Sequence, residues 1–412
     1  MEYCRLDGDT GRLRTEIKHP RLLLFNPGHE MVPEIIGKKP YVPPPVVRSM
    51  MRDLGLLPAW LTKSEQDFVF CPEKTLPIPD THPLKPEARL LQIPDTALPL
   101  NDYTLDMWGQ SPVWLAALQH RFLWLSTVSA PYYPHELYER SHRCEAARCL
   151  EAIGHSEMAA HWFTSINDFL KERYHCLPPD SALLAKLPSS SSGRGLIWLS
   201  SSPTDDEIDL LTKALRRAGS FSVEPVLDVR QDWAAEFYSN GKGELYFVGW
   251  SRFDTNRWGA YLGNRLATQT DLVAELTQTV GAQAHEEAIA SVKDYLRERF
   301  ASLYTGYIGV DMAVYAERDS LFLHPCIEIN VRYTMGVAAI LLYDLWIEKG
   351  RRGVFEVKSF RTEGEAHEWD SMMQCSHPPL IMDGRLRAGF LPLTIPARSS
   401  RFLAYLLITE DR

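Results

Sequence analysis

A chain of 412 residues is long for a single hydrophobic core, so two or three domains are expected. Its 45% hydrophobic and 24% charged residues are typical of a globular protein, and a net charge of −9 without a Lys/Arg run excludes a general nucleic-acid binder. The seven cysteines are odd in number and form no CxxC pair, so we expect reduced thiols rather than a disulfide framework.

No membrane or export signal is visible in the sequence. The first 19 residues carry charges throughout, and no later segment approaches the roughly 20 apolar residues of a membrane span. We therefore expect a cytoplasmic protein with neither a membrane nor a nucleic acid as partner.

The first part of the chain has the pattern of a small α/β domain. Arg21 to Asn26 (RLLLFN) is a compact apolar run that predicts a buried strand. Pro43 to Gly55 places prolines ahead of a helical pattern that a glycine closes, and WGQSP at Trp108 to Pro112 opens another helix.

Polar residues follow the first predicted strand directly. Asn26, His29 and Glu30 would lie at the edge where open α/β sheets bind ligands. A plain, solvated strand exit has the same sequence pattern, so the role of these three residues stays open.

Helical patterns dominate after Pro134. Residues 135–154 (HELYERSHRCEAARCLEAIG), Glu157 to Tyr174 and Asp271 to Phe300 each predict helix. A further helix should begin after Thr204, which forms a capping box with Glu207.

A serine-rich loop lies between two predicted strands. Ala182 to Leu187, with Lys186 near its end, precedes the loop PSSSSGRGL, and Leu196 to Leu199 follows it. The backbone N–H groups of such a loop can fold over phosphates, because Gly193 and Gly195 permit positive φ and close approach. The spacing is not that of a P-loop, and a flexible serine linker is the alternative.

A hinge and a hairpin come next. Ser222 to Leu227 is a short strand interrupted by Pro225, which suits an edge or a hinge whose free backbone groups could bind an adenine edge. Trp233 to Tyr238 and Glu244 to Arg252 then predict an antiparallel pair, turned at Asn240 to Gly243.

The segment after this hairpin is basic. RFDTNRWGAYLGNR holds Arg252, Arg257, Asn264 and Arg265 among glycines. Such a loop could hold phosphates and an anionic substrate, although a solvated loop would also carry exposed arginines.

The most informative stretch runs from Tyr307 to Gly336. Two apolar runs, Ile308 to Tyr315 and Leu321 to Val331, are separated by a short polar turn and predict a β-hairpin.

This hairpin carries a row of polar side chains. Residues i and i+2 on a strand share a face, so Glu328, Asn330 and Arg332 should point the same way. In the natural register Asp311 on the partner strand lies beside them, and hard oxygen donors of this kind suit Mg²⁺ and its phosphates. The alternative is a set of polar residues on the solvated face of an antiparallel pair.

Three apolar segments follow at the C-terminal end. Phe355 to Phe360, Leu380 to Leu393 and Arg401 to Thr409 predict strands. We expect them to complete the preceding lobe or to pack on the first domain.

The combination of KLPSSSSGRGL, VEPV and GVDMAV followed by CIEINVR resembles the ATP-grasp superfamily, over about Ser141 to Val337. The resemblance implies an α/β fold in which ATP lies between two α+β lobes, after a small α/β domain. The expected boundaries are 1–138 for the N-terminal α/β domain, 139–225 for the first lobe with the flap, 226–345 for the second lobe with the metal site, and 346–412 for a C-terminal extension.

The resemblance also implies catalytic and metal-binding residues. Asp311, Glu328 and Asn330 would hold Mg²⁺, and Arg332 would steady the transferred phosphate or acyl-phosphate. Arg265 is expected to be a second catalytic cation.

Further residues are implied to hold the nucleotide. Glu224 and Val226 would lie in the adenine hinge and Glu236 near the ribose. Many members carry a second lysine where this chain has Arg143, so Arg143 would have to serve in its place. The other implied phosphate contacts are Lys186, Ser189, Ser190, Ser191, Ser192, Gly193, Arg194 and Gly195.

The implied reaction joins a small-molecule carboxylate to an amine through an acyl-phosphate, with ATP and Mg²⁺ as cofactors. Phosphoryl transfer needs positioning and charge neutralisation rather than a protein nucleophile, which agrees with the lack of a GxSxG motif. A small-metabolite kinase and a nucleotide-binding module without turnover are the alternatives, and a homo-oligomer is left open.

Overall fold

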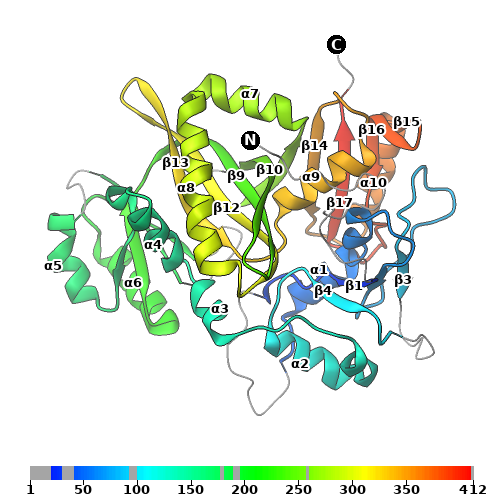
Figure 1. Cartoon of the computed structure of the whole chain (residues 1–412), viewed down its shortest axis with the longest axis horizontal. Coiled ribbons are helices and arrows are strands. Elements are labelled where there is room, and N and C mark those ends of the chain that lie inside the picture. Colours follow the sequence, from blue (N-terminus) through cyan, green and yellow to red (C-terminus); the bar gives the residue numbers. More distant parts are fainter. Residues whose placement is uncertain are drawn as a thin grey trace.

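Three β-sheets organise the protein in the computed structural model, which describes residues 20–29, 41–91, 100–176, 181–188, 195–256 and 259–409. The first sheet has four strands, the second has four and the third has nine. Figure 1 shows the second sheet at the left with α5 and α6, and the long third sheet extending across the molecule toward the right.

The N-terminal sheet is parallel, with strand order β3-β2-β1-β4. Its elements are β1 (Arg21–Leu24), α1 (Pro45–Leu54), β2 (Phe68–Phe70), β3 (Arg89–Leu91), β4 (Thr104–Met107) and α2 (Pro112–Arg121). The apolar side of α1, with Val47 and Met51, packs on this sheet, as the proline-led helical pattern predicted.

The second sheet is antiparallel, with order β5-β8-β6-β7. Its elements are β5 (His161–Phe163), α5 (Ile166–Cys176), β6 (Leu183–Lys186), β7 (Leu196–Leu199), α6 (Asp205–Ala218) and β8 (Phe221–Pro225). The predicted capping box is confirmed, because Thr204 and Glu207 bond each other's backbone amides.

Three predictions of continuous helix are wrong, and one of them, Asp271 to Phe300, is divided at Gly281 into two helices. The first half of Glu157 to Tyr174 is a short 3-10 turn followed by β5, and the α-helix begins only at Ile166. Residues 135–154 contain two helices, α3 (His135–Arg140) and α4 (Cys144–Ala152), separated by three residues that end with Arg143. In β5, pairing with β8 overrides the local helical pattern.

The nine-stranded sheet is antiparallel throughout, with order β13-β12-β9-β10-β11-β14-β17-β16-β15. Its strands are β9 (Asp228–Asn240), β10 (Leu245–Thr255), β11 (Tyr261–Leu266), β12 (Thr305–Glu317), β13 (Ser320–Asn330), β14 (Gly353–Ser359), β15 (Leu380–Met382), β16 (Arg385–Pro392) and β17 (Phe402–Ile408). The segment after residue 345 therefore extends the same sheet as the central hairpin.

Different helices cover the two faces of this sheet. On one face α7 (Gln269–Val280) and α8 (Ala282–Phe300) pack over Trp233 and Met312. On the other face lies α9 (Met335–Trp346), almost all of whose side chains are buried. Figure 1 shows α9 between the central strands and the C-terminal strands, which α10 (Glu365–Ser376) flanks.

Hydrogen bonds connect the N-terminal segment to α9 and to the C-terminal strands. Trp60 donates through Nε1 to the carbonyl of Leu393, and Trp346 donates to the carbonyl of Trp60, both at 2.6 Å. Buried Asp53 accepts hydrogen bonds from the amides of Arg401 and Phe402. The α/β fold class, with α+β lobes after a small parallel α/β unit, is confirmed. Among the described helices none combines the length and apolarity that a bilayer crossing requires.

Candidate active site

The hairpin of β12 and β13 brings two acidic side chains together. Asp311 pairs directly with Glu328, and Gly309 pairs with Asn330, in the register that the sequence predicted. Directly opposed residues in an antiparallel pair point to the same face. Asn330 completes the cluster with a side-chain hydrogen bond to Asp311.

Arg332 reaches this cluster from a turn and not from the strand, which corrects the expected row of three side chains on β13. The strand ends at Asn330, and the amide of Arg332 bonds back to the carbonyl of Asn330 at 3.0 Å. The guanidinium donates to Asn330 Oδ1 at 2.8 Å and to the carbonyl of Tyr333 at 3.2 Å. Arg332 therefore remains beside the two carboxylates.

Asp311 is half-buried among acidic side chains. Burial, followed by the charges of Glu328 and Glu236, raises the pKa of Asp311 well above its usual range, and Arg332 and Asn330 only partly oppose this. Two carboxylates and an amide oxygen are ligands that Mg²⁺ accepts, so the residues fit a metal. Within the described ranges no group of three or more His, Cys, Asp and Glu side chains could hold a metal, so a metal here would take the side-chain oxygen of Asn330 as its third ligand.

Glu236 lies beneath this cluster and not beside a ribose. Its side chain is fully buried, and its two oxygens accept hydrogen bonds from the hydroxyls of Ser251 at 3.0 Å and Thr334 at 2.9 Å. Burial raises the pKa of Glu236 to about 7, against the opposing effect of these hydroxyls and of Arg332. The predicted ribose contact does not fit this position.

The two cations expected to contact phosphates are each paired with a carboxylate. Arg143 forms a two-pronged ion pair with Glu328, with Nε to Oε1 at 3.0 Å and Nη2 to Oε2 at 3.1 Å. Lys186 Nζ lies 2.5 Å from Glu224 Oε1. The first pair joins Arg143, directly before α4, to the acidic cluster of Asp311 and Glu328. The second pair joins β6, which leads into the flap, to the end of β8.

The base of the flap shows the positive φ that the loop pattern predicted. Gly195 has a positive φ of 85°, and its carbonyl accepts a hydrogen bond from the amide of Leu187 at 3.1 Å. The amide of Arg143 donates to the carbonyl of Pro188 at 3.4 Å. The predicted phosphate contacts Ser189, Ser190, Ser191, Ser192, Gly193 and Arg194 lie outside the described residues.

The hinge has fewer free backbone groups than expected. The amide of Val226 donates to the carbonyl of Ala182 at 2.9 Å, so this donor is already used within the small lobe. Glu224 lies at the end of β8, next to Lys186 on β6.

Arg265 does not lie with the cluster, which is a second correction. The predicted basic loop is strand β11, and two strands separate it from β12. Arg265 pairs with Asp254 at 3.4 Å, and Asp254 is three residues from Ser251, whose side chain points to the face of Glu236. Residues an odd number of positions apart on a strand point to opposite faces, so Asp254 lies on the face away from Glu236. Arg265 pairs with Asp254 and lies on that same face. Arg257 lies outside the described residues.

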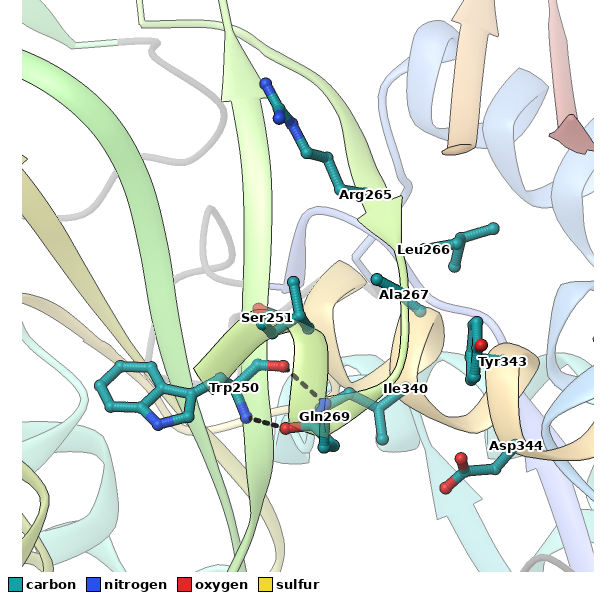
Figure 2. A pocket seen from close by; sticks show the side chains of 11 residues that line it. Trp250, Ser251, Arg265, Leu266, Ala267, Gln269, Ile340, Tyr343 and Asp344 are labelled. Carbon is teal, nitrogen blue, oxygen red and sulfur yellow. Dashed lines mark hydrogen bonds between the residues drawn. The ribbon is translucent and has the colours of Figure 1, made fainter. Parts of the chain in front are cut away.

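A shallow hollow lies between β10, β11, α7 and α9 (Figure 2). Gln269 closes its floor by bonding both backbone groups of Trp250, at 2.7 and 2.9 Å. Figure 2 shows Arg265 extending along the strands, away from these two side chains. Of the predicted site residues only Arg265 lines this hollow, so it is separate from the metal cluster.

The N-terminal sheet contributes residues that the sequence did not single out. Tyr333 donates to Asp106 Oδ2 at 2.9 Å and stacks on Trp108, with ring centroids 5.5 Å apart. Asp106 belongs to the last residues of a parallel strand, which is the signal that could have identified it. Of the polar residues after β1, buried Asn26 exchanges two hydrogen bonds with the backbone of Gly109, and Glu30 lies outside the described residues.

The elements around the cluster follow the order that the sequence motifs implied. An antiparallel lobe with a loop between two paired strands is joined through β8 to a larger antiparallel sheet that carries the acidic hairpin. This order of elements is the one that the resemblance to the ATP-grasp superfamily implied.

Comparisons with known proteins find a remote likeness to solved structures. No protein-family model and no curated protein matches the chain. N5-carboxyaminoimidazole synthetase from Staphylococcus aureus is similar at 11% identity and a TM-score of 0.48, over 97% of this chain and 95% of that one. Biotin carboxylase from Campylobacter jejuni, solved as a β,γ-ATP complex, is similar at 12% identity and a TM-score of 0.48, over 75% and 71% of the two chains.

Proposed function

We propose that this chain is a Mg²⁺- and ATP-dependent ligase that joins a small-molecule carboxylate to an amine through an acyl-phosphate. The observation that carries the proposal is the direct pairing of Asp311 with Glu328, with Asn330 and Arg332 at the same end of the hairpin. Like charges directly opposite each other on two strands are destabilising, and a bound cation would offset this cost.

Asp311, Glu328 and Asn330 are the residues that would hold the metal. The metal supplies charge neutralisation between phosphate oxygens. The carboxylates, on the paired strands of a rigid hairpin, would fix its position relative to the flap, and this positioning is what phosphoryl transfer requires from a protein.

Cations from both lobes would hold the phosphates. Lys186 ends β6 at the base of the flap, and Arg143 begins α4 beside Pro188. Arg332 is the remaining cation, and its planar fork can bind two oxygens of a phosphate or acyl-phosphate.

The acceptor substrates would lie toward the N-terminal sheet. Polar groups at the carboxyl ends of parallel strands are ligand-binding positions in α/β proteins. Asp106 on β4 is 2.9 Å from the hydroxyl of Tyr333, the residue after Arg332. A ligand bound at this edge of the N-terminal sheet would therefore lie close to a phosphate held by Arg332, as a two-substrate reaction requires.

A small-metabolite kinase on the same scaffold is the alternative. Both enzymes transfer the γ-phosphate to an oxygen, and only the ligase then passes the acyl group to an amine. A panel of carboxylates and amines should be screened for ADP formation in the presence of Mg²⁺, and an active carboxylate should then be labelled with ¹⁸O.

The label separates the hypotheses. A ligase transfers one ¹⁸O from the carboxylate to inorganic phosphate. Its full rate of ADP formation requires both the carboxylate and the amine. A kinase accumulates a phosphorylated product with one substrate and releases no phosphate. A protein that binds ATP and forms no ADP with any substrate would be a binding module, and the ligase proposal would fall.

A further inference from the structure

Arg143 contacts the base of the flap and the metal cluster at once. Its amide donates to the carbonyl of Pro188, directly before the serine-rich loop. Its guanidinium holds both carboxylate oxygens of Glu328, at 3.0 and 3.1 Å. Arg143 therefore connects the base of the loop that is expected to cover the phosphates with a carboxylate that is expected to bind the metal.

The pair is geometrically strong and shielded. The side chain of Arg143 is 10% exposed and that of Glu328 25% exposed. Two parallel N–H···O⁻ bonds are the favoured geometry of an arginine with a carboxylate, and partial burial reduces screening by solvent.

A guanidinium and a metal ion compete for these oxygens. The fork of Arg143 uses Oε1 and Oε2 together and holds a positive charge beside both oxygens, so a metal that binds Glu328 is repelled unless at least one of the two hydrogen bonds breaks. A guanidinium released into a half-buried site needs another anion, because an unpaired charge there is costly.

We propose that Arg143 is an exchangeable counter-ion, which neutralises Glu328 when no metal is bound and moves to the nucleotide phosphates when metal and nucleotide enter together. This inference rests on the proposed function and deepens it, because it assigns Arg143 to the coupling between the two ligands. It also explains why arginine serves at this position: its fork imitates a divalent cation toward a carboxylate and later binds two phosphate oxygens.

The consequence is reciprocal coupling between the two ligands. Metal alone must displace Arg143 without providing it a new partner and binds weakly. The nucleotide provides that partner, so metal and nucleotide each tighten the binding of the other by the same factor. The expected factor is about tenfold or more, the effect of one nearby unit charge at a partly buried site.

Arg143→Gln tests the exchange without any measurement of turnover. Mn²⁺ binding to the protein alone is measured by electron paramagnetic resonance, and Mg-ADP binding by calorimetry. We expect the variant to bind Mn²⁺ about tenfold more tightly than the wild type and Mg-ADP about tenfold more weakly. Arg143→Lys keeps the charge without the fork and should lie between the two for Mn²⁺.

Arg148→Gln is the matched control on the same helix. Arg148 pairs with Glu145 at 3.0 Å, away from Glu328, and should change neither affinity. Circular dichroism and melting temperature show whether each variant is folded, and if Arg143→Gln does not fold, Arg143→Lys decides alone: it must still bind Mn²⁺ more tightly than the wild type.

Two results overturn the exchange. An unchanged or weaker Mn²⁺ affinity in a folded Arg143 variant means that the pair is structural. An unchanged Mg-ADP affinity in Arg143→Gln means that the guanidinium does not move to the phosphates. If the wild type binds no nucleotide at any metal concentration, the proposed function fails instead, whatever Mn²⁺ does at Glu328.

Discussion

The hydroxyl of Thr334 donates to the carboxylate of Glu236 at 2.9 Å and accepts a hydrogen bond from the amide of Val337 at the same distance. Thr334 is therefore the N-cap of α9, and Glu236 on β9 is held to the first turn of that helix. Since Arg332 and Tyr333 directly precede the cap, this contact couples the position of both residues to the sheet that carries Asp311.

The raised pKa of Glu236 predicts a dependence of stability on pH. The folded protein retains the proton up to about pH 7, whereas the unfolded chain releases it near the ordinary value of 4.5, so the free energy of unfolding falls as pH rises through this window. In EDTA, Glu236→Gln should match the wild type near pH 5 and exceed its stability at pH 8 by about 3 kcal/mol. Denaturant unfolding across this range measures the difference, and parallel curves would contradict a raised pKa.

Gly336→Ala should disturb the site without removing any chemical group. A methyl group at Gly336 would collide with Glu236 Oε1 and Ser251 Oγ. Replacing a helical glycine by alanine ordinarily raises stability by up to about 1 kcal/mol. Because of the collision, we expect Gly336→Ala instead to lower the free energy of unfolding by about 1–3 kcal/mol.

A double-mutant cycle supplies the control for Gly336→Ala. Glu236→Ala removes the colliding oxygen, and the combined variant should lose less stability than the sum of the single changes. If the losses of stability in the two single variants were strictly additive, the methyl group at position 336 would not collide with Glu236.

The metal assignment predicts a separation of activity from stability. Asp311→Asn combined with Glu328→Gln should nearly abolish turnover and Mg-nucleotide binding, because both charged ligands are lost. The fold should remain, since an amide at position 311 relieves the electrostatic cost that raises the pKa of this acid and so offsets the loss of the ion pair between Arg143 and Glu328. Calorimetry with Mg-ATP and a thermal melt are the measurements, and full turnover in the double variant would remove the metal assignment.

Arg332→Lys tests the cation at the end of the hairpin. The variant should keep much of the ATP affinity but lower kcat by roughly 10²-fold or more, if the two-pronged contact forms chiefly in the transition state. A structural role through Asn330 and Tyr333 predicts the opposite: a lower melting temperature with unchanged kcat per folded molecule.

Local pattern was sufficient for most elements and for the core of the site. The strand at Arg21, the capping box at Thr204, the hairpin and the pairing of Asp311 with Glu328 all follow from residues close in sequence. A short hairpin turn fixes the register of its strands, and register fixes which side chains share a face. The helix predicted from Glu157 failed where a short strand finds its partner in β8.

Tertiary structure decided the contacts between residues far apart in the chain. Arg143 and Glu328 are separated by 185 positions, and no periodicity in either segment predicts that they form an ion pair. The sequence could not show that Glu236 is buried under α9 or that Arg265 points to the opposite face, because both depend on the order of strands in the large sheet. Sequence determines which residues a short hairpin sets side by side, whereas long-range strand order and helix packing determine which charges then meet across the fold, since they bring together segments that are distant along the chain.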